Sequence, residues 1–140
     1  MDGTLGEVRL FAGNFAPKGW EFCHGQLIGT GQNQALFSLL GATYGGDGRE
    51  SFALPDLRGR VPVGVGEGPE LSEVPWGAKF GQETITVDGV DIQSHTHSEA
   101  EDVTESYTNA AMGGTTYETQ PPSLGLNYII CVVGYYPSRD

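Results

Sequence analysis

Short stretches in which apolar and polar residues alternate recur along the chain and predict β-strands. Residues 7–12 read EVRLFA, where every second side chain is apolar, and residues 83–87 alternate in the same way. Residues 20–28 (WEFCHGQLI) alternate around Gly25, so they predict a bent strand or a hairpin. Leu126–Val133 (LNYIICVV) is apolar enough to form a strand that is covered on both faces. We therefore expect a chain rich in short strands.

One stretch changes to the spacing of a helix. Leu36, Leu39 and Leu40 fall at helical intervals and would form a single apolar stripe. Asn33 can cap the start of this helix, and Gly41 can end it in a left-handed backbone conformation. The pattern predicts one short helix between these caps, with its three leucines buried.

Glycine-rich stretches separate the predicted elements. Thr43–Gly48 (TYGGDG) and the Gly/Pro/Glu-rich residues 64–75 predict shaped loops. We expect a β-rich fold, mainly β with one short helix and long loops, in a single domain over residues 1–140. Its parts would be a strand and helix core half at residues 1–66, an acidic loop-rich segment at 67–120, and a C-terminal core strand at 121–140.

The charge of the chain excludes some partners. The formal net charge is −11, with only seven Lys and Arg residues, so binding to a nucleic-acid backbone is not expected. Residues 67–105 hold most of this charge, with ten carboxylates and one lysine. A solvated loop and a cation-attracting surface both fit this segment. No apolar run approaches the ~20 residues of a membrane helix, and no basic and apolar leader opens the chain, so neither membrane insertion nor a signal peptide is expected.

Two cysteines and two arginines have predicted structural roles. Cys23 and Cys131 each lie in an apolar stretch, where a thiol packs as a small hydrophobic group, although a disulfide between them is an open alternative. Arg58 and Arg60 follow Pro55 in the segment LPDLRGR, which is placed to bridge carboxylates or loop carbonyls. None of these residues by itself indicates catalysis.

The candidate chemistry of the chain lies in the sequence Ser-His-Thr-His-Ser at residues 94–98. In a strand, His95 and His97 would present two imidazoles on one side, about 6 to 7 Å apart. Two ligands from one chain bind a metal weakly, so surface histidines beside an acidic loop are the alternative interpretation. His24 lies far away in an apolar stretch, and we interpret it as structural.

Four segments of the sequence resemble a known family, the phage tail collar domain proteins, also called microcystin-dependent proteins. These segments are GEVRLFAGNFAPKGWEFCHGQL, NQALFSLLGATYGGDG, FALPDLRGRVPVG and the closing LNYIICVVGYYPSRD. Together with the His-x-His sequence they span nearly the whole chain. The chain departs from the family pattern at His24, where an Asp is common, and in the residues before His95.

The resemblance implies a non-enzymatic structural and adhesive role in a tail fibre or tail tip. It implies an intertwined homotrimer in which His95 and His97 of three chains share one transition-metal ion, which could be Fe, Zn, Co or Ni. The implied partners are other tail or baseplate proteins and a cell-surface glycan or other receptor. The protein would be made in the host cytoplasm without a signal peptide and would act in a virion tail or an extracellular phage-derived particle.

Two other functions compete with this expectation. The first alternative is a cupin-like metalloenzyme. The first metal motif of cupins has the same spacing as four residues of this chain, namely Gly89, His95, His97 and Glu101. The later glycine of that motif is Thr108 here, and no histidine follows to complete the site. A small-molecule or glycan-binding module is the third possibility, either at the His95 and His97 pair or on exposed aromatic rings. The candidate rings are those of Trp20, Trp76 and the Tyr135–Tyr136 pair.

Overall fold

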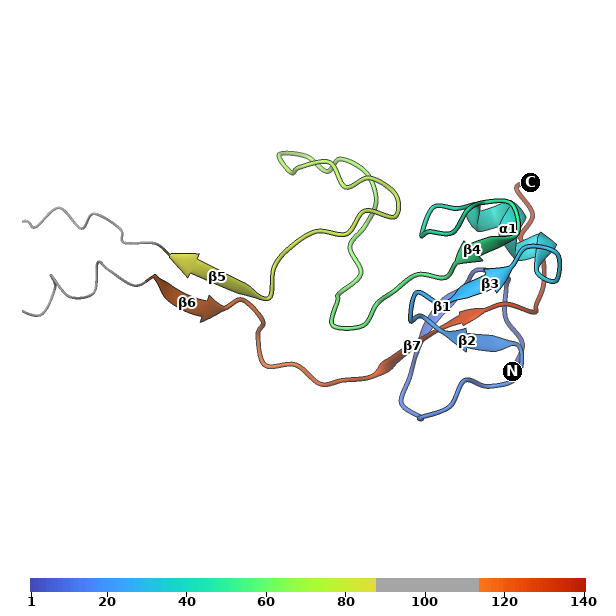
Figure 1. The fold of residues 1–140 in the computed structure, drawn as a ribbon, viewed down its shortest axis with the longest axis horizontal. Coiled ribbons are helices and arrows are strands. Elements are labelled where there is room, and N and C mark those ends of the chain that lie inside the picture. Colours follow the sequence, from blue (N-terminus) through green and yellow to red (C-terminus); the bar gives the residue numbers. More distant parts are fainter. Residues whose placement is uncertain (88–113) are drawn as a thin grey trace, which may run out of the picture. The chain divides into compact units, whose positions relative to one another are not determined.

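The computed structural model of the chain describes residues 1–87 and 114–140. The chain divides into two compact units, of which the first joins Met1–Lys79 to Leu124–Asp140 and the second comprises Phe80–Ser123. The elements of the first unit are β1 (Val8–Phe11), β2 (Trp20–Phe22), β3 (Leu27–Gly29), α1 (Gln34–Leu40), β4 (Ser51–Ala53) and β7 (Asn127–Cys131) (Figure 1). The second unit holds β5 (Thr84–Val87) and β6 (Thr115–Glu118). Within the described residues, the predicted β-rich fold with one short helix is confirmed.

A three-stranded antiparallel sheet, in the order β1-β7-β2, organises the first unit. β7 is central, because Val8 of β1 faces Ile130 on one side and Trp20 of β2 faces Cys131 on the other. Ile129 and Ile130 point to opposite faces of the sheet and are both fully buried. The prediction that this stretch is a strand covered on both faces is therefore confirmed.

The alternating stretch at residues 20–28 is split between two sheets. β2 pairs with β7, whereas β3 pairs with β4 in a separate two-stranded sheet, with Leu27 opposite Ala53. The chain bends at Gly25, as predicted, but the two halves do not form a hairpin with each other. β4 was not predicted, because three residues are too few to display a period of two.

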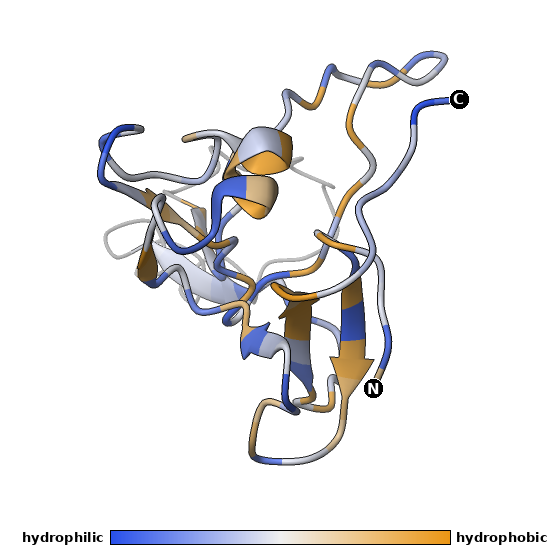
Figure 2. Ribbon diagram, turned by 90° about the vertical axis from the view of Figure 1, so that its right-hand side faces the viewer, coloured by the Kyte–Doolittle hydropathy of each residue, from blue (hydrophilic) through white to orange (hydrophobic). Residues whose placement is uncertain are grey.

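The predicted helix is present as α1, and its burial differs from the prediction at one position. Asn33 precedes the helix, and Gly41 ends it with φ of 56° while its N–H donates to the carbonyl of Phe37. Leu36 and Leu40 are buried, whereas Leu39 is only partly buried and shares the margin of the core with Phe37. The apolar side of α1 is visible as an orange face in Figure 2. The expectation that all three leucines are fully buried is thus wrong for Leu39.

Two apolar clusters form the core of the first unit. The larger one joins α1, β4 and β7, and its buried members are Leu5, Cys23, Leu36, Leu40, Phe52, Leu54 and Ile130. The smaller one is built from Trp20, Ile129 and Cys131, with Phe11 and Phe22 packed against it. Cys23 and Cys131 belong to different clusters and are both free thiols, so the alternative of a disulfide between them is wrong.

Candidate functional site

The two predicted metal ligands lie outside the described residues. His95 and His97 fall in the segment that connects Val87, the last residue of β5, to Thr115, the first residue of β6. In the part of the chain that the structure describes, no group of three or more His, Cys, Asp or Glu side chains could hold a metal ion. His24, the remaining histidine, stacks on Phe22 with ring centroids 4.9 Å apart.

The strands that flank this segment form a two-sided ribbon. β5 and β6 are antiparallel, and Ile85 faces Tyr117 while Thr86 faces Thr116. Since side chains alternate along a strand, Ile85, Val87 and Tyr117 share one face of the ribbon. The opposite face is polar, and there the hydroxyl oxygens of Thr86 and Thr116 lie 3.2 Å apart. All eight residues of the ribbon are exposed, so its apolar face is open to solvent.

The segment LPDLRGR is held beside residues 23–26 by backbone hydrogen bonds. The N–H groups of Leu54 and Leu57 donate to the carbonyls of Gln26 and Cys23 at 3.1 and 3.0 Å. This pairing places Asp56 and Arg58 at the surface, where they form a local ion pair.

The ion pair uses both oxygens of the carboxylate. Arg58 Nε donates to Asp56 Oδ1 at 2.9 Å, and a second guanidinium nitrogen donates to Oδ2 at 2.8 Å. Hydrogen bonds from the Arg58 side chain and backbone hold the pKa of Asp56 well below its usual range. The prediction that Arg58 pairs with a carboxylate is confirmed. For Arg60, whose side chain makes no hydrogen bond or ion pair within the described residues, the same role stays a prediction.

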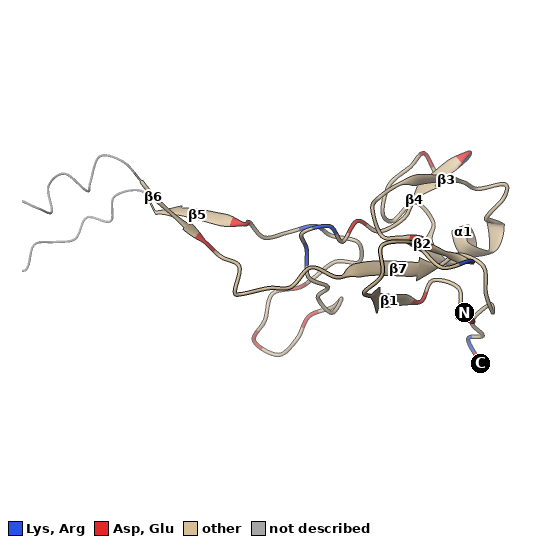
Figure 3. Cartoon of the chain, turned by 90° about the horizontal axis from the view of Figure 1, so that it is seen from below, with Lys and Arg blue, Asp and Glu red and all other residues tan. Residues whose placement is uncertain are grey.

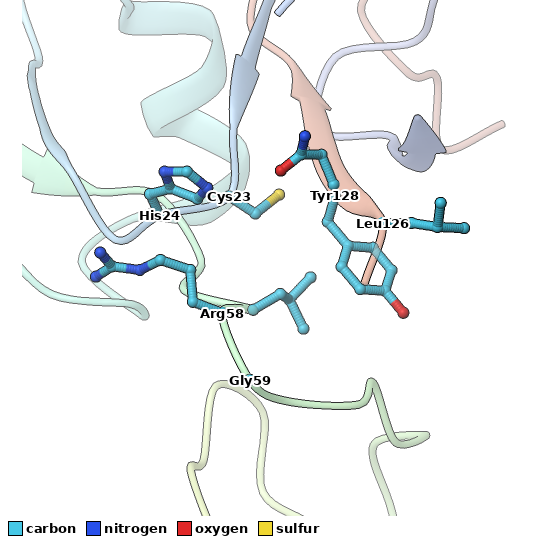
Figure 4. Close-up of a pocket in the computed structure, with 8 residues that line it drawn as sticks. Cys23, His24, Arg58, Gly59, Leu126 and Tyr128 are labelled. Carbon is cyan, nitrogen blue, oxygen red and sulfur yellow. The ribbon is translucent and has the colours of Figure 1, made fainter. Parts of the chain in front are cut away.

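A small pocket lies beside this ion pair (Figure 4). Its volume is about 70 Å³, and its lining residues are Cys23, His24, Leu57, Arg58, Gly59, Leu126, Asn127 and Tyr128. Burial raises the pKa of the Cys23 thiol to about 12, so this sulfur stays protonated and is not an activated nucleophile. The space suits a few water molecules rather than a substrate. We therefore find no arrangement for covalent catalysis among the residues that line this pocket.

The described part of the acidic segment is a solvated loop. The N–H and carbonyl groups of Gly66 and Val74 exchange two hydrogen bonds of 2.9 Å, which close the loop between them. Glu67, Glu70 and Glu73 in this loop are all exposed. In the part of the chain that is coloured in Figure 3, acidic residues lie on loops and at strand ends. Of the two interpretations offered by the sequence, a solvated loop fits residues 67–73.

Comparison with known families gives a match to the N-terminal part of the chain. Residues 6–62 match the family model described as Phage Tail Collar Domain. These residues are therefore similar to a phage tail collar domain over about two fifths of the chain. The collar match covers β1 to β4, α1 and the Asp56–Arg58 pair, whereas β5, β6 and β7 lie beyond it. A search of the curated proteins found no match.

The collar family indicates a structural role in a phage tail fibre, in association with other phage tail components. It also indicates a place in the virion tail, and it is a structural family rather than a family of enzymes. The resemblance seen in the sequence is thereby confirmed for residues 6–62. None of the helices in the described residues is long and apolar enough to cross a membrane.

Proposed function

We propose that this chain is a homotrimeric, non-enzymatic part of a tail fibre, in which one metal ion held by His95 and His97 of three chains joins the subunits. The assembled trimer would bind neighbouring tail or baseplate proteins and a receptor on the cell surface. The observation that best supports this proposal is the exposed apolar face of the ribbon formed by β5 and β6. These two strands flank, in sequence, the segment that contains His95 and His97.

The described residues of this unit do not cover the apolar face of the ribbon. An isolated two-stranded ribbon is at best marginally stable in water, because it has little apolar surface to bury. Ile85 and Tyr117 are directly opposite each other, yet both are at least half exposed. Copies of the same face, which carries no charged side chain, can pack against one another around a symmetry axis. Contact between subunits would remove these side chains from water.

A second exposed apolar stretch in the first unit supports association. Val61, Val63 and Val65 are all exposed and are spaced two residues apart in a segment without strand pairing. Monomeric proteins rarely leave contiguous apolar surface open, and such surface marks sites of protein association. The chain thus presents apolar surface to a partner in both of its units.

The donor set fits a shared transition-metal ion. One chain supplies two imidazoles and three chains supply six, which is the number that an octahedral ion accepts. Fe, Co and Ni suit such a set by geometry, whereas Zn is usually tetrahedral in proteins and would be accommodated. With every position filled by protein, no open position would remain for a substrate. The residues of this chain would therefore hold the subunits together rather than catalyse a reaction.

The test is the mass and metal content of the native protein. We expect a trimer by native mass spectrometry and sedimentation, with one metal ion for every three chains. The double variant His95→Ala, His97→Ala should lose the ion and dissociate, while the matched variant His24→Ala should keep both. Because imidazole binds metal only when unprotonated, the wild-type trimer should weaken as the pH falls below about 6. A monomer, or one metal ion per chain, would contradict the proposal, and the second result would favour a cupin-like site.

A further inference from the structure

Trp76 is an exposed aromatic side chain that its own chain already holds in place. Its exposed fraction is 55 %, whereas that of Trp20, the other tryptophan, is 3 %. Trp76 Nε1 donates a hydrogen bond of 3.2 Å to the hydroxyl oxygen of Tyr44, and the two rings are nearly perpendicular, with centroids 6.4 Å apart. Tyr44 in turn packs against the larger apolar cluster. The indole is thus connected to the core while its surface remains open.

The backbone beside Trp76 strengthens this attachment. Gly77 lies so close to Thr43 that a Cβ at position 77 would meet the Thr43 Cγ2 at 2.7 Å and its carbonyl oxygen at 2.9 Å. The φ angle of Gly77 is 79°, which other residues rarely adopt. These contacts bring the loops at residues 43–44 and 76–77 together. The Trp76 ring is therefore presented by two loops in contact, and holding it does not depend on a partner.

The chemistry left open on this surface is that of an aromatic face beside a hydroxyl group. The indole N–H already has an acceptor, so the unsatisfied part of Trp76 is its apolar ring surface. Tyr44 accepts a hydrogen bond there and retains its own O–H as a donor.

We propose that Trp76 and Tyr44 form a stacking platform for a pyranose ring. A pyranose presents a face of C–H groups that can lie on the indole, and a hydroxyl group at the ring margin can accept a hydrogen bond from the Tyr44 O–H. This platform rests on the proposed receptor-binding function for its biological setting, and it identifies the class of receptor as a glycan. One such contact is weak, and repetition in three subunits would raise the avidity.

The test is saturation-transfer NMR of the full chain with methyl β-D-glucopyranoside and methyl β-D-galactopyranoside, with sorbitol as an acyclic control. We expect saturable transfer to the ring C–H protons of at least one pyranoside and none to sorbitol. Trp76→Ala should weaken binding by about tenfold or more, which corresponds to about 1.4 kcal/mol. Trp76→Phe should retain part of the binding because it keeps a ring face. Tyr135→Ala, which removes an exposed ring elsewhere in the same unit, should leave binding unchanged.

Four results would overturn the platform: no transfer to either sugar, equal transfer to sorbitol, undiminished binding by Trp76→Ala, or an equal loss in Tyr135→Ala. Sedimentation of the same samples tests whether a second copy of the chain, rather than a sugar, covers the Trp76 ring. If Trp76→Ala changes the sedimentation coefficient, the indole is a subunit contact and the proposal is wrong. A metal-bound trimer that ignores both sugars would overturn the platform alone, whereas sugar binding by a monomer would overturn the trimer alone.

Discussion

The central sheet strand β7 and the ribbon of β5 and β6 use similar residues and reach opposite degrees of burial. In β7, Ile129 and Ile130 are fully buried because sheet neighbours, α1 and β4 lie around them. In the ribbon, Ile85 and Tyr117 are paired across the strands but remain exposed. The contrast teaches that β-pairing alone does not bury a side chain. One region completes its core within the chain, and we propose that the other completes it between chains.

The largest expected effect tests the region that is complete by itself. Leu36→Ala should lower the free energy of unfolding by about 2–5 kcal/mol, because it removes a fully buried side chain from the larger cluster. Leu27→Ala is the matched control, since Leu27 is exposed and its loss should change stability by no more than about 0.5 kcal/mol. Urea unfolding at a fixed protein concentration measures both. Equal midpoints for the two variants would show that α1 does not anchor the core.

An intermediate effect is expected in the ribbon, and it should appear in association rather than in folding. Ile85→Thr keeps a β-branched side chain but places a hydroxyl on the apolar face. We expect the association constant to fall by about tenfold, or about 1.4 kcal/mol, while far-UV circular dichroism stays unchanged. Thr84→Ser, on the polar face, is the control and should associate as the parent does. If both variants associate normally in sedimentation, the apolar face is not a subunit contact.

The smallest effect is expected at the Asp56–Arg58 pair. The Arg58 side chain is mostly exposed, so replacing its bidentate contact by Arg58→Lys should move the unfolding midpoint at pH 7 less than Leu36→Ala does. The pKa of Asp56 is lower in the folded chain than in the unfolded chain, so the contribution of the pair is present above about pH 3.9 and declines as the pH falls further. Between pH 6 and 4 the collar domain should therefore stay folded while the histidine-dependent trimer weakens. Circular dichroism and sedimentation over this range separate the two events, and simultaneous loss would contradict the separation.

Several features could be predicted from the sequence because local residues decide them. The helix is specified by its leucine spacing and by Gly41, whose left-handed φ ends it. The apolar run that contains β7 indicates a strand covered on both faces, and this is what the sheet shows. Asp56 and Arg58 are two residues apart, so their ion pair is also local. Of these features, the helix and the Asp56–Arg58 pair lie within the residues that match the collar family model.

Other features could not be predicted from the pattern of neighbouring residues, because they depend on segments that are far apart in the sequence. β6 follows two glycines and is too short to show a clear alternation, and its partner β5 lies about 30 residues earlier, so local pattern did not predict it. The candidate metal ligands remain a prediction from the sequence, and the platform at Trp76 depends on Tyr44, which is 32 residues away.

The sequence by itself determined the bend at Gly25, the short helix, the strand at β7 and the similarity of residues 6–62 to the collar family. Only the tertiary structure decided that residues 20–28 divide between two sheets, that Trp20 is buried while Trp76 is exposed, and that Cys23 and Cys131 lie in separate clusters. The physical reason is that turn and helix preferences act between near neighbours, whereas burial depends on which distant segments arrive on each face.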